Sequence, residues 1–450
     1  MLSIDEIYNI LDEIKQKLDN LNLDGYAILV ESKLSRQIRF ASNRISVTKT
    51  WDETTFEILV EKDQRVSAFS VGLASKELIP KLAQNVIEIM KKAPPRPDYA
   101  PLPEPASNYP EPPAGVDQSL ISQPEKLLNI AQKAINTGLQ EGAKKIAGTI
   151  LATTYNHVLE TSSGFRKGLP LSNIYLDVRA FMSKEATGHA SIASNRLSEI
   201  YADKIAYLAA RDAKLSENPI SLDPGRYNTV FTIDATASLM NLIGGASSAY
   251  AVDAGYSFFI KKLGEKLAPE ELNIEDNPLH PNGYHIRTFD DEGVPTRKLK
   301  IIENGTLKHY LHNRFTAKKF NAEHTGHAGW MFPCPWEIVV YPRDMTWDEL
   351  LEQIGKGLVI SNATYIRFQN YVTGDFSAII RDGVYYVENG EIKHAVKGLR
   401  LSDNVPRILQ NIIGIGKEAR QVFHWWLEWD IPVITPALAV KDVGYTKAIT

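Results

Sequence analysis

The histidines and the single cysteine are the residues with the clearest capacity for metal chemistry. His324 and His327 flank a Thr-Gly pair, and Cys334 follows between two prolines. Imidazole nitrogens and a thiolate are donors that zinc prefers, so His324, His327 and Cys334 could form a zinc site. Their spacing matches no standard zinc-ligand pattern, and ordinary loop residues are the simpler interpretation. His309 and His312 lie on a predicted strand, where a spacing of three points them to opposite faces and separates them as ligands.

Two further motifs have both a chemical and a structural interpretation. The carboxylates of Asp290, Asp291 and Glu292 could bind a hard cation, but the glycine and proline that follow favour a solvated turn. Gly414-Ile-Gly416-Lys417 resembles a phosphate loop, but it follows a predicted helix instead of a strand. A helix end followed by a turn is therefore the favoured interpretation of this segment.

The aromatic residues Phe423, Trp425, Trp426 and Trp429 lie close together near the C-terminus, with His424 among them. Rings at this density could form a binding platform. They could equally pack into a core or against another domain or subunit. The sequence leaves both interpretations open.

The elements that must position these residues begin with an amphipathic helix over 4–21 and a predicted meander. Its strands are expected at 26–30, 36–49, 54–61 and 65–71. Ser75 is the expected N-cap of a helix over 76–91. A run of nine prolines between residues 93 and 113 then predicts an extended connector, because proline donates no backbone hydrogen bond. A second helix, meander and helix follow, at 124–142, 145–153, 157–162, 174–184 and 197–214.

The C-terminal half is predicted to be rich in strands. A strand at 227–233 precedes a helix over 239–250, with Asp234 or Thr236 as its N-cap. Asn304-Gly305 and Asn389-Gly390 each predict a tight hairpin. A helix over 404–415 and a strand over 432–440 complete the pattern. The fold class is therefore α+β. The predicted units are 1–92, a Pro-rich connector 93–123, 124–217, and a C-terminal domain 227–450.

Composition limits the classes of function. Fifty Lys and Arg against 54 Asp and Glu give a formal net charge of −4, which offers no general attraction to nucleic acid. A single cysteine excludes an intrachain disulfide and fits a reducing compartment. The N-terminal residues lack a signal peptide, and no apolar run is long enough to span a membrane. We therefore expect a soluble cytoplasmic protein.

Six segments, in this order and spacing, resemble the TldD/PmbA family of metallopeptidases. The segments are 290–296, 301–307, 325–329, 373–377, 387–392 and 396–399. The resemblance is clear from about residue 227 onward, and 25–50 resembles the family's opening meander. It implies the family's α+β fold.

The resemblance also identifies where zinc would bind. TldD-type members carry a His-Glu-x-x-x-His motif on a helix, with a further cysteine ligand in a late loop. Aligned here, Met240 and Gly245 occupy the histidine positions and Asn241 the glutamate position, and the late loop 423–427 has no cysteine. An asparagine cannot take up and return a proton as a carboxylate does. The chain therefore resembles the branch called PmbA or TldE, and no cofactor is expected in it.

The resemblance implies a heterodimer in which a TldD-type subunit supplies zinc and unfolded peptides enter an enclosed groove. The expected groove residues are His327, Gly374, Asp375 and Ser377. One alternative is an active hydrolase with a relocated metal site drawn from His324, His327, Cys334 or His424. Another is a stand-alone homodimer that binds peptides.

Overall fold

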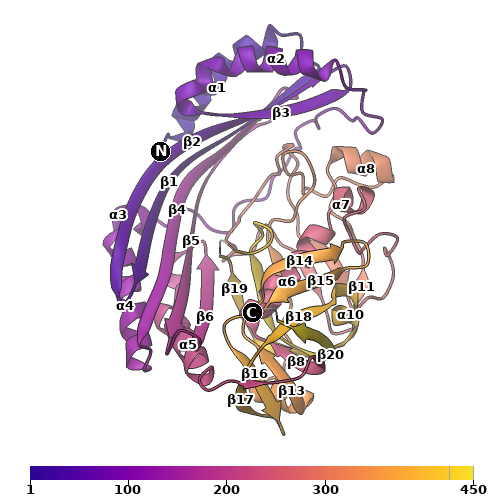
Figure 1. Cartoon of the computed structure of the whole chain (residues 1–450). Helices are drawn as coiled ribbons and strands as arrows, with labels where there is room; N and C mark the ends of the chain where they lie inside the picture. Colours follow the sequence, from indigo (N-terminus) through magenta and orange to yellow (C-terminus); the bar gives the residue numbers. More distant parts are fainter. Residues whose placement is uncertain (425, 449–450) are drawn as a thin grey trace.

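Two β-sheets, one from each half of the chain, organise the computed structural model (Figure 1). The structure describes residues 1–424 and 426–448. An N-terminal sheet of six strands curves around the C-terminal domain, whose own sheet has fourteen strands. The predicted α+β class, with an N-terminal meander and a β-rich C-terminal half, is confirmed.

The N-terminal sheet has the strand order β3-β2-β1-β4-β5-β6, and every neighbouring pair is antiparallel. Its strands are β1 (Gly25–Ala41), β2 (Arg44–Lys62), β3 (Arg65–Gly72), β4 (Lys145–Thr161), β5 (Arg166–Phe181) and β6 (Thr187–Ser194). The predicted units 1–92 and 124–217 contribute three strands each. They join where β1 pairs with β4, from Ala27 opposite Thr161 to Phe40 opposite Gly148.

Several predicted strand boundaries in this sheet are wrong. A turn at Ser42 and Asn43, with φ of 49° and 68°, interrupts the predicted strand 36–49. The segment before this turn instead continues β1. The stretch 31–35 between the two predicted strands is also part of β1, where Ser32 is fully buried and its hydroxyl lies 2.8 Å from that of Thr54. Strands 145–153 and 157–162 are likewise one strand, β4, and β6 was not predicted.

Helices cover the outer face of this sheet (Figure 1). They are α1 (Ile4–Asp19), α2 (Ile79–Met90), α3 (Ser119–Ser122), α4 (Glu125–Gln140) and α5 (Ala202–Leu215). Ser3 and Glu6 form a capping box that begins α1. The predicted Ser75 cap is wrong, because a 3₁₀ turn, η1 (Leu73–Leu78), precedes α2. A second 3₁₀ turn, η2 (Leu197–Glu199), similarly precedes α5.

The Pro-rich connector packs against the protein along its length. Residues 93–118, all of them described, form no helix or strand, but the predicted connector 93–123 also contains the short helix α3. Leu102 and Ala114 are buried in an apolar cluster with Phe165 and Phe289. The Tyr109 hydroxyl donates to the Gly293 carbonyl at 2.7 Å. The connector therefore contacts both the N-terminal sheet and the C-terminal domain.

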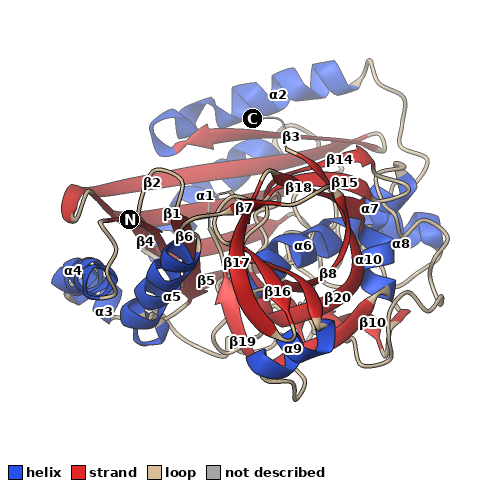
Figure 2. Ribbon diagram, turned by 60° about the horizontal axis from the view of Figure 1, so that its bottom comes forward, coloured by secondary structure: helices blue, strands red, loops and turns tan. Residues whose placement is uncertain are grey.

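The C-terminal domain is built around one helix, α6 (Ile233–Ala246). Figure 2 shows it enclosed by strands on several sides, and every residue of α6 except Ile233 and Gly245 is buried. The strands beside it include β8 (Gly225–Phe231) and β20 (Val433–Lys447). Its N-cap is Thr232, so the predicted caps Asp234 and Thr236 are wrong. A short helix, α7 (Ala249–Asp253), follows.

The remaining elements complete the C-terminal sheet and its coverings. They are β7 (Ile220–Ser221), β9 (Ile274–Asp276), β10 (Leu299–Glu303), β11 (Thr306–Leu307), α8 (Arg314–Phe320), β12 (Ile338–Val340), α9 (Trp347–Ile354), β13 (Lys356–Ile360), β14 (Thr364–Asn370), β15 (Asp375–Ile379), β16 (Val384–Glu388), β17 (Glu391–Lys397), β18 (Leu399–Asn404), α10 (Val405–Gln410) and β19 (Ile412–Val422). Among the described residues, no helix is both long and apolar enough to span a membrane.

Both predicted Asn-Gly hairpins are confirmed, since all four turn residues have positive φ, as a type I′ turn requires. Two other predictions in this half are wrong. The predicted helix 404–415 ends at Gln410, so Gly414-Ile-Gly416 lies within strand β19 and not at a helix end. The segment carrying His309 and His312 is irregular, because β11 ends at Leu307.

Candidate functional site

The three zinc-motif positions all lie on α6, in the interior of the C-terminal domain. Met240 is 1% exposed and belongs to the main apolar core. Asn241 is fully buried, and Gly245 is partly exposed. The sequence alignment therefore places the motif on a well-defined helix, and the neighbours of these residues decide what the site can do.

Asn241 holds the late loop against α6 through three hydrogen bonds. Its Nδ2 donates to the carbonyl oxygens of Trp429 at 3.1 Å and Ile431 at 2.8 Å. Its Oδ1 accepts the Trp429 backbone N–H at 2.9 Å. Both ends of the carboxamide are thus engaged with backbone groups. A carboxylate at this position could not donate to the two carbonyls.

The indole of Trp429 occupies the space beside Gly245. A Cβ added at Gly245 would lie 2.8 Å from both Cε2 and Nε1 of this ring. A histidine side chain would need the volume that the indole fills. Met240 supplies a thioether, Asn241 a fully bonded carboxamide, and Gly245 no side chain. These residues do not fit a catalytic zinc ion, which takes imidazole, carboxylate or thiolate ligands.

His327 and His324 are each held by acidic residues. His327 is fully buried, with Nε2 3.2 Å from Asp276 and Nδ1 2.9 Å from the Thr325 carbonyl. His324 places Nε2 2.8 Å from Glu292, and its Nδ1 accepts the Gly326 N–H. Both nitrogens of each ring therefore already have protein partners. Across the described residues, no group of three or more His, Cys, Asp or Glu side chains is arranged to hold a metal ion.

The acidic triplet is buried, so the predicted solvated turn is wrong. Asp290 is fully buried, Asp291 is 9% exposed and Glu292 5% exposed. Asp290 organises the loop: its Oδ1 accepts the Glu292 and Val294 N–H groups, and its Oδ2 accepts that of Ala328 at 2.9 Å. This last bond ties the triplet to the Thr-Gly-His-Ala-Gly segment.

The triplet and its neighbours form an acidic junction between the two halves of the molecule. Glu61 of β2 forms a buried ion pair with Arg314 of α8, and Arg314 also pairs with Glu292 at 3.4 Å. Burial raises the pKa of Asp290 to about 6 and that of Asp291 to about 8. Burial opposes ionisation of Glu292 too, but Arg314 and His324 hold its pKa below the ordinary value. The junction is thus a buried set of charged groups that joins the sheet to the C-terminal domain.

Of the other proposed metal ligands, Cys334 lies beside His327, whose carbonyl accepts the Cys334 N–H at 2.9 Å, and His424 lies elsewhere. Burial raises the pKa of the Cys334 thiol well above its ordinary value, which disfavours a thiolate. His424 lies beside His189 and Trp426, with ring centroids 5.6 and 4.7 Å away. It thus belongs to a different cluster from His324 and His327.

The proposed groove residues of the second recognisable loop lie at the β14–β15 turn. Gly374 is buried with φ +77°, and a Cβ there would meet Pro406 Cδ at 2.7 Å. Asp375 accepts from the Thr373 hydroxyl at 2.6 Å and from Asn404 at 2.9 Å. Their contacts lie within this turn and α10, whereas the contacts of His327 lie at the end of β9.

Ser377 completes this group on the adjoining strand. It is 8% exposed, and its hydroxyl accepts from Arg400 at 2.9 Å.

Phe423, of the aromatic residues near the C-terminus, packs in a small cluster with Tyr175 and Tyr284, and so belongs to a core between the two halves. Trp425 lies outside the described residues.

Trp429 is the residue that sequence reasoning failed to place. It is 43% exposed, so one part of the ring covers Gly245 and another part faces solvent. The available signal was the aromatic-rich composition of the late loop. Nothing in the sequence showed that this loop covers the altered helix.

Comparison with known protein families identifies the C-terminal domain. Residues 224–447 match the family model described as the PmbA/TldA metallopeptidase C-terminal domain. These residues therefore form a C-terminal domain of the PmbA/TldD family, as the sequence resemblance predicted.

Named relatives agree with this assignment. The metalloprotease PmbA of Escherichia coli O157:H7 is 28% identical over 201 residues, 45% of this chain and 43% of that protein. A metalloprotease of Methanocaldococcus jannaschii is 34% identical over 185 residues, 39% and 40% of the two chains. A zinc metalloprotease TldD homolog of Saccharolobus solfataricus is 30% identical over 213 residues, 46% and 45% of the two chains. The match thus spans less than half the length of these three relatives.

Two solved structures share the fold over nearly the whole chain. TldE from Thermococcus kodakarensis has a TM-score of 0.83 at 20% identity, covering 97% of this chain and all of that one. A Thermotoga maritima protein, described as a modulator of a DNA gyrase, has a TM-score of 0.83 at 22% identity, covering 98% and 100%. At these identities the likeness establishes the fold.

Proposed function

We propose that this chain is the metal-free, non-catalytic subunit of a two-subunit peptidase of the TldD/TldE type. The observation that carries the proposal is the state of α6: Asn241 is fully bonded to the late loop, and the Trp429 indole fills the space beside Gly245. Zinc and the general base would come from a TldD-type partner subunit. The proposal of two kinds of subunit is supported by the existence of relatives named TldD and TldE.

We further propose that the complex degrades or matures unfolded peptides in the cytoplasm, and that this subunit shapes the groove. Of the four groove residues inferred from sequence, Asp375 is partly exposed and can meet a peptide. His327, Gly374 and Ser377 are buried, so their proposed role is to hold the groove loops in shape.

The test is reconstitution with a TldD-type subunit from the same organism. The chain alone should bind less than about a tenth of an equivalent of zinc, because real zinc sites bind tightly, and should not cleave an unfolded peptide. The mixture should elute as a heterodimer and cleave it. Asp375→Ala should slow cleavage by the mixture, whereas Asp348→Ala on the surface of α9 should leave it unchanged.

Other outcomes would replace this proposal. Close to one equivalent of zinc, lost together with cleavage in His327→Ala, would identify a relocated metal site. A stable homodimer that ignores the TldD-type subunit would identify a stand-alone peptide-binding protein.

A further inference from the structure

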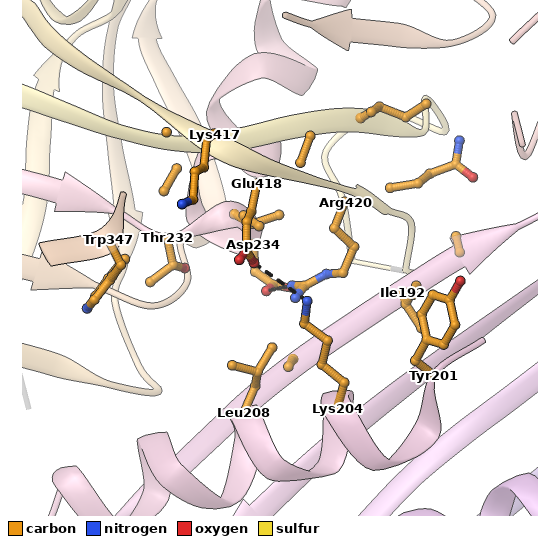
Figure 3. A pocket seen from close by; sticks show the side chains of 18 of the residues that line it. Ile192, Tyr201, Lys204, Leu208, Thr232, Asp234, Trp347, Lys417, Glu418 and Arg420 are labelled. Atoms are coloured by element: carbon orange, nitrogen blue, oxygen red, sulfur yellow. Dashed lines mark hydrogen bonds and ion pairs between the residues drawn. The ribbon is translucent and has the colours of Figure 1, made fainter. Parts of the chain in front are cut away.

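A cavity of about 410 Å³ lies where the edge of the N-terminal sheet meets the C-terminal domain. Its walls come from β6 and α5 on one side, and from β19, α9 and the start of α6 on the other (Figure 3). Met240, Asn241 and Gly245 are not among its lining residues. The volume is in the range of small-molecule sites, and the position between two domains is one where such sites are common.

Buried charges form the floor of the cavity. Asp234 accepts the backbone N–H and the hydroxyl of Ser191, at 3.0 and 2.9 Å, and forms an ion pair with Arg420. The Arg420 side chain is 10% exposed, and its Nε has no hydrogen-bond partner among the described residues. The guanidinium therefore retains a donor in a largely buried position, where an unpaired polar group is costly.

The start of α6 adds a second source of positive potential. Thr232, Ile233 and Asp234 line the cavity. The Thr232 hydroxyl donates to the Ser361 carbonyl at 2.7 Å, and no side-chain cap is present at this helix end, which the structure fully describes. The first N–H groups of a helix have no intrahelical acceptor and carry partial positive charge, which favours a carboxylate.

The mouth of the cavity carries charges of both signs. Lys204 of α5 and Glu418 of β19 face each other across it at 3.6 Å, with exposures of 59% and 71% (Figure 3). Lys417, on the same wall, has no ion-pair partner within the part of the chain that the structure describes. Exposed ion pairs at this distance contribute little energy. Lys204 and Glu418 can therefore separate, and each can pair with a charged group of a ligand instead.

The lining chemistry selects one class of ligand. Arg420, Lys417 and the helix start favour an anionic group, whereas Asp234 and Glu418 in the same space would repel a ligand with negative charge alone. Leu208, Ile192 and Trp347 supply apolar surface beside these charges. A ligand that matches has one carboxylate, one ammonium group and an apolar side chain.

We propose that this cavity binds a small zwitterion, a free amino acid or a dipeptide with both termini free. The carboxylate lies against Arg420, Lys417 and the start of α6, and the ammonium group lies near Glu418. The site uses residues of this chain alone. It is therefore independent of the proposed zinc partner, and its test does not depend on peptidase activity.

The test uses calorimetric titration of the full chain with leucine and with Leu-Leu as the probes. At least one should bind saturably, and the tighter one identifies the natural size of the ligand. N-acetylation or C-terminal amidation of that probe should each weaken binding about tenfold or more, since each removes a charge-assisted hydrogen bond. Equal binding of both blocked analogues would overturn the proposal.

Variants then locate the site. Lys417→Gln removes one cation, and Leu208→Trp fills the cavity; each should weaken binding about tenfold or more, with an unchanged circular dichroism spectrum. Lys441→Gln, at an exposed lysine on β20 outside the cavity, is the matched control and should bind normally. Binding unaffected by both cavity variants, or absent at about 10 mM probe, would refute the site.

Discussion

Replacement of Asn241 by aspartate is the most direct test of how the late loop is held on α6. The two residues have nearly the same shape, so packing is preserved and the hydrogen-bonding pattern alone changes. The Nδ2 atom of Asn241 donates to carbonyl oxygens at 3.1 and 2.8 Å. In Asn241→Asp both donors are lost, and a buried carboxylate faces two carbonyl oxygens.

The magnitude follows from these contacts. Asn241→Ala loses three hydrogen bonds and leaves backbone groups unpaired, which should lower the free energy of unfolding by about 3–5 kcal/mol. Asn241→Asp should cost at least as much at pH 8, because an unpaired buried charge costs several kcal/mol more. At pH 5 its carboxyl should be protonated, since repulsion and burial raise its pKa, and part of the loss should return.

The assay is urea denaturation followed by circular dichroism at pH 5 and pH 8. Hydrogen exchange of a peptide containing Trp429 reports on the loop itself. Exchange of the Trp429 amide should accelerate in Asn241→Ala, which removes its acceptor Oδ1. It should also accelerate in Asn241→Asp, which keeps an acceptor oxygen but repels the two carbonyl oxygens of the loop and so favours its opening. Asn129→Ala and Asn129→Asp, on the exposed face of α4, are the controls. Wild-type stability of Asn241→Asp at both pH values, with unchanged exchange, would refute the reasoning.

Three further predictions concern zinc, pH and the acidic junction. The double variant Met240→His, Gly245→His keeps Asn241 and its hydrogen bonds to the late loop, and it should still retain less than about a tenth of an equivalent of zinc after gel filtration, because Trp429 occupies the space; tight stoichiometric binding would contradict this. Burial raises the pKa of Asp291 to about 8, so the folded state holds a proton that the unfolded state releases at lower pH, and stability falls as pH rises from about 4 to 8. The melting temperature of Asp291→Asn minus that of the wild type should therefore increase from pH 5 to pH 8. A difference that stays constant over this range would show that the pKa of Asp291 is not raised. Arg314→Met should lower stability by about 3–5 kcal/mol, since it leaves Glu61 buried without its cation, and adding Glu61→Leu should recover part of the loss in urea denaturation.

Local signals in the sequence predicted the local structure well. The Asn-Gly hairpins depend on turn residues that tolerate positive φ, and the first helix depends on its apolar spacing, so both were predictable. Long strands were divided because polar residues interrupt their pattern. Some of those residues are buried and paired with partners on other strands, as Ser32 is with Thr54 and Ser35 with Thr153. Strand β6 was missed because Thr187–Ser194 contains one large apolar residue, Ile192, among small and polar ones, and every residue is buried, so there is no alternation to detect.

In the candidate site, too, local features were predictable from the sequence and long-range contacts were not. The residue types at Met240, Asn241 and Gly245 were readable from the sequence, and their place on one helix is local information. The contact between Asn241 and Trp429 joins residues 188 positions apart, so no local pattern contains it. The burial of Asp290–Glu292 likewise depends on Arg314 and His324, which arrive from α8 and the loop after it. Sequence reasoning therefore identified the three positions on the helix and missed the loop that covers them.

The pairing of β1 with β4 has a consequence for synthesis of the chain. The pair Ala27 and Thr161 is separated by more than one hundred residues. While the chain emerges from the ribosome, β1, β2 and β3 can pair with one another, but one edge of β1 stays open until β4 has been made. Open strand edges are sites of aggregation. The nascent N-terminal segment should therefore need chaperone protection for longer than the late hairpins, whose partner strands emerge within a few residues of each other.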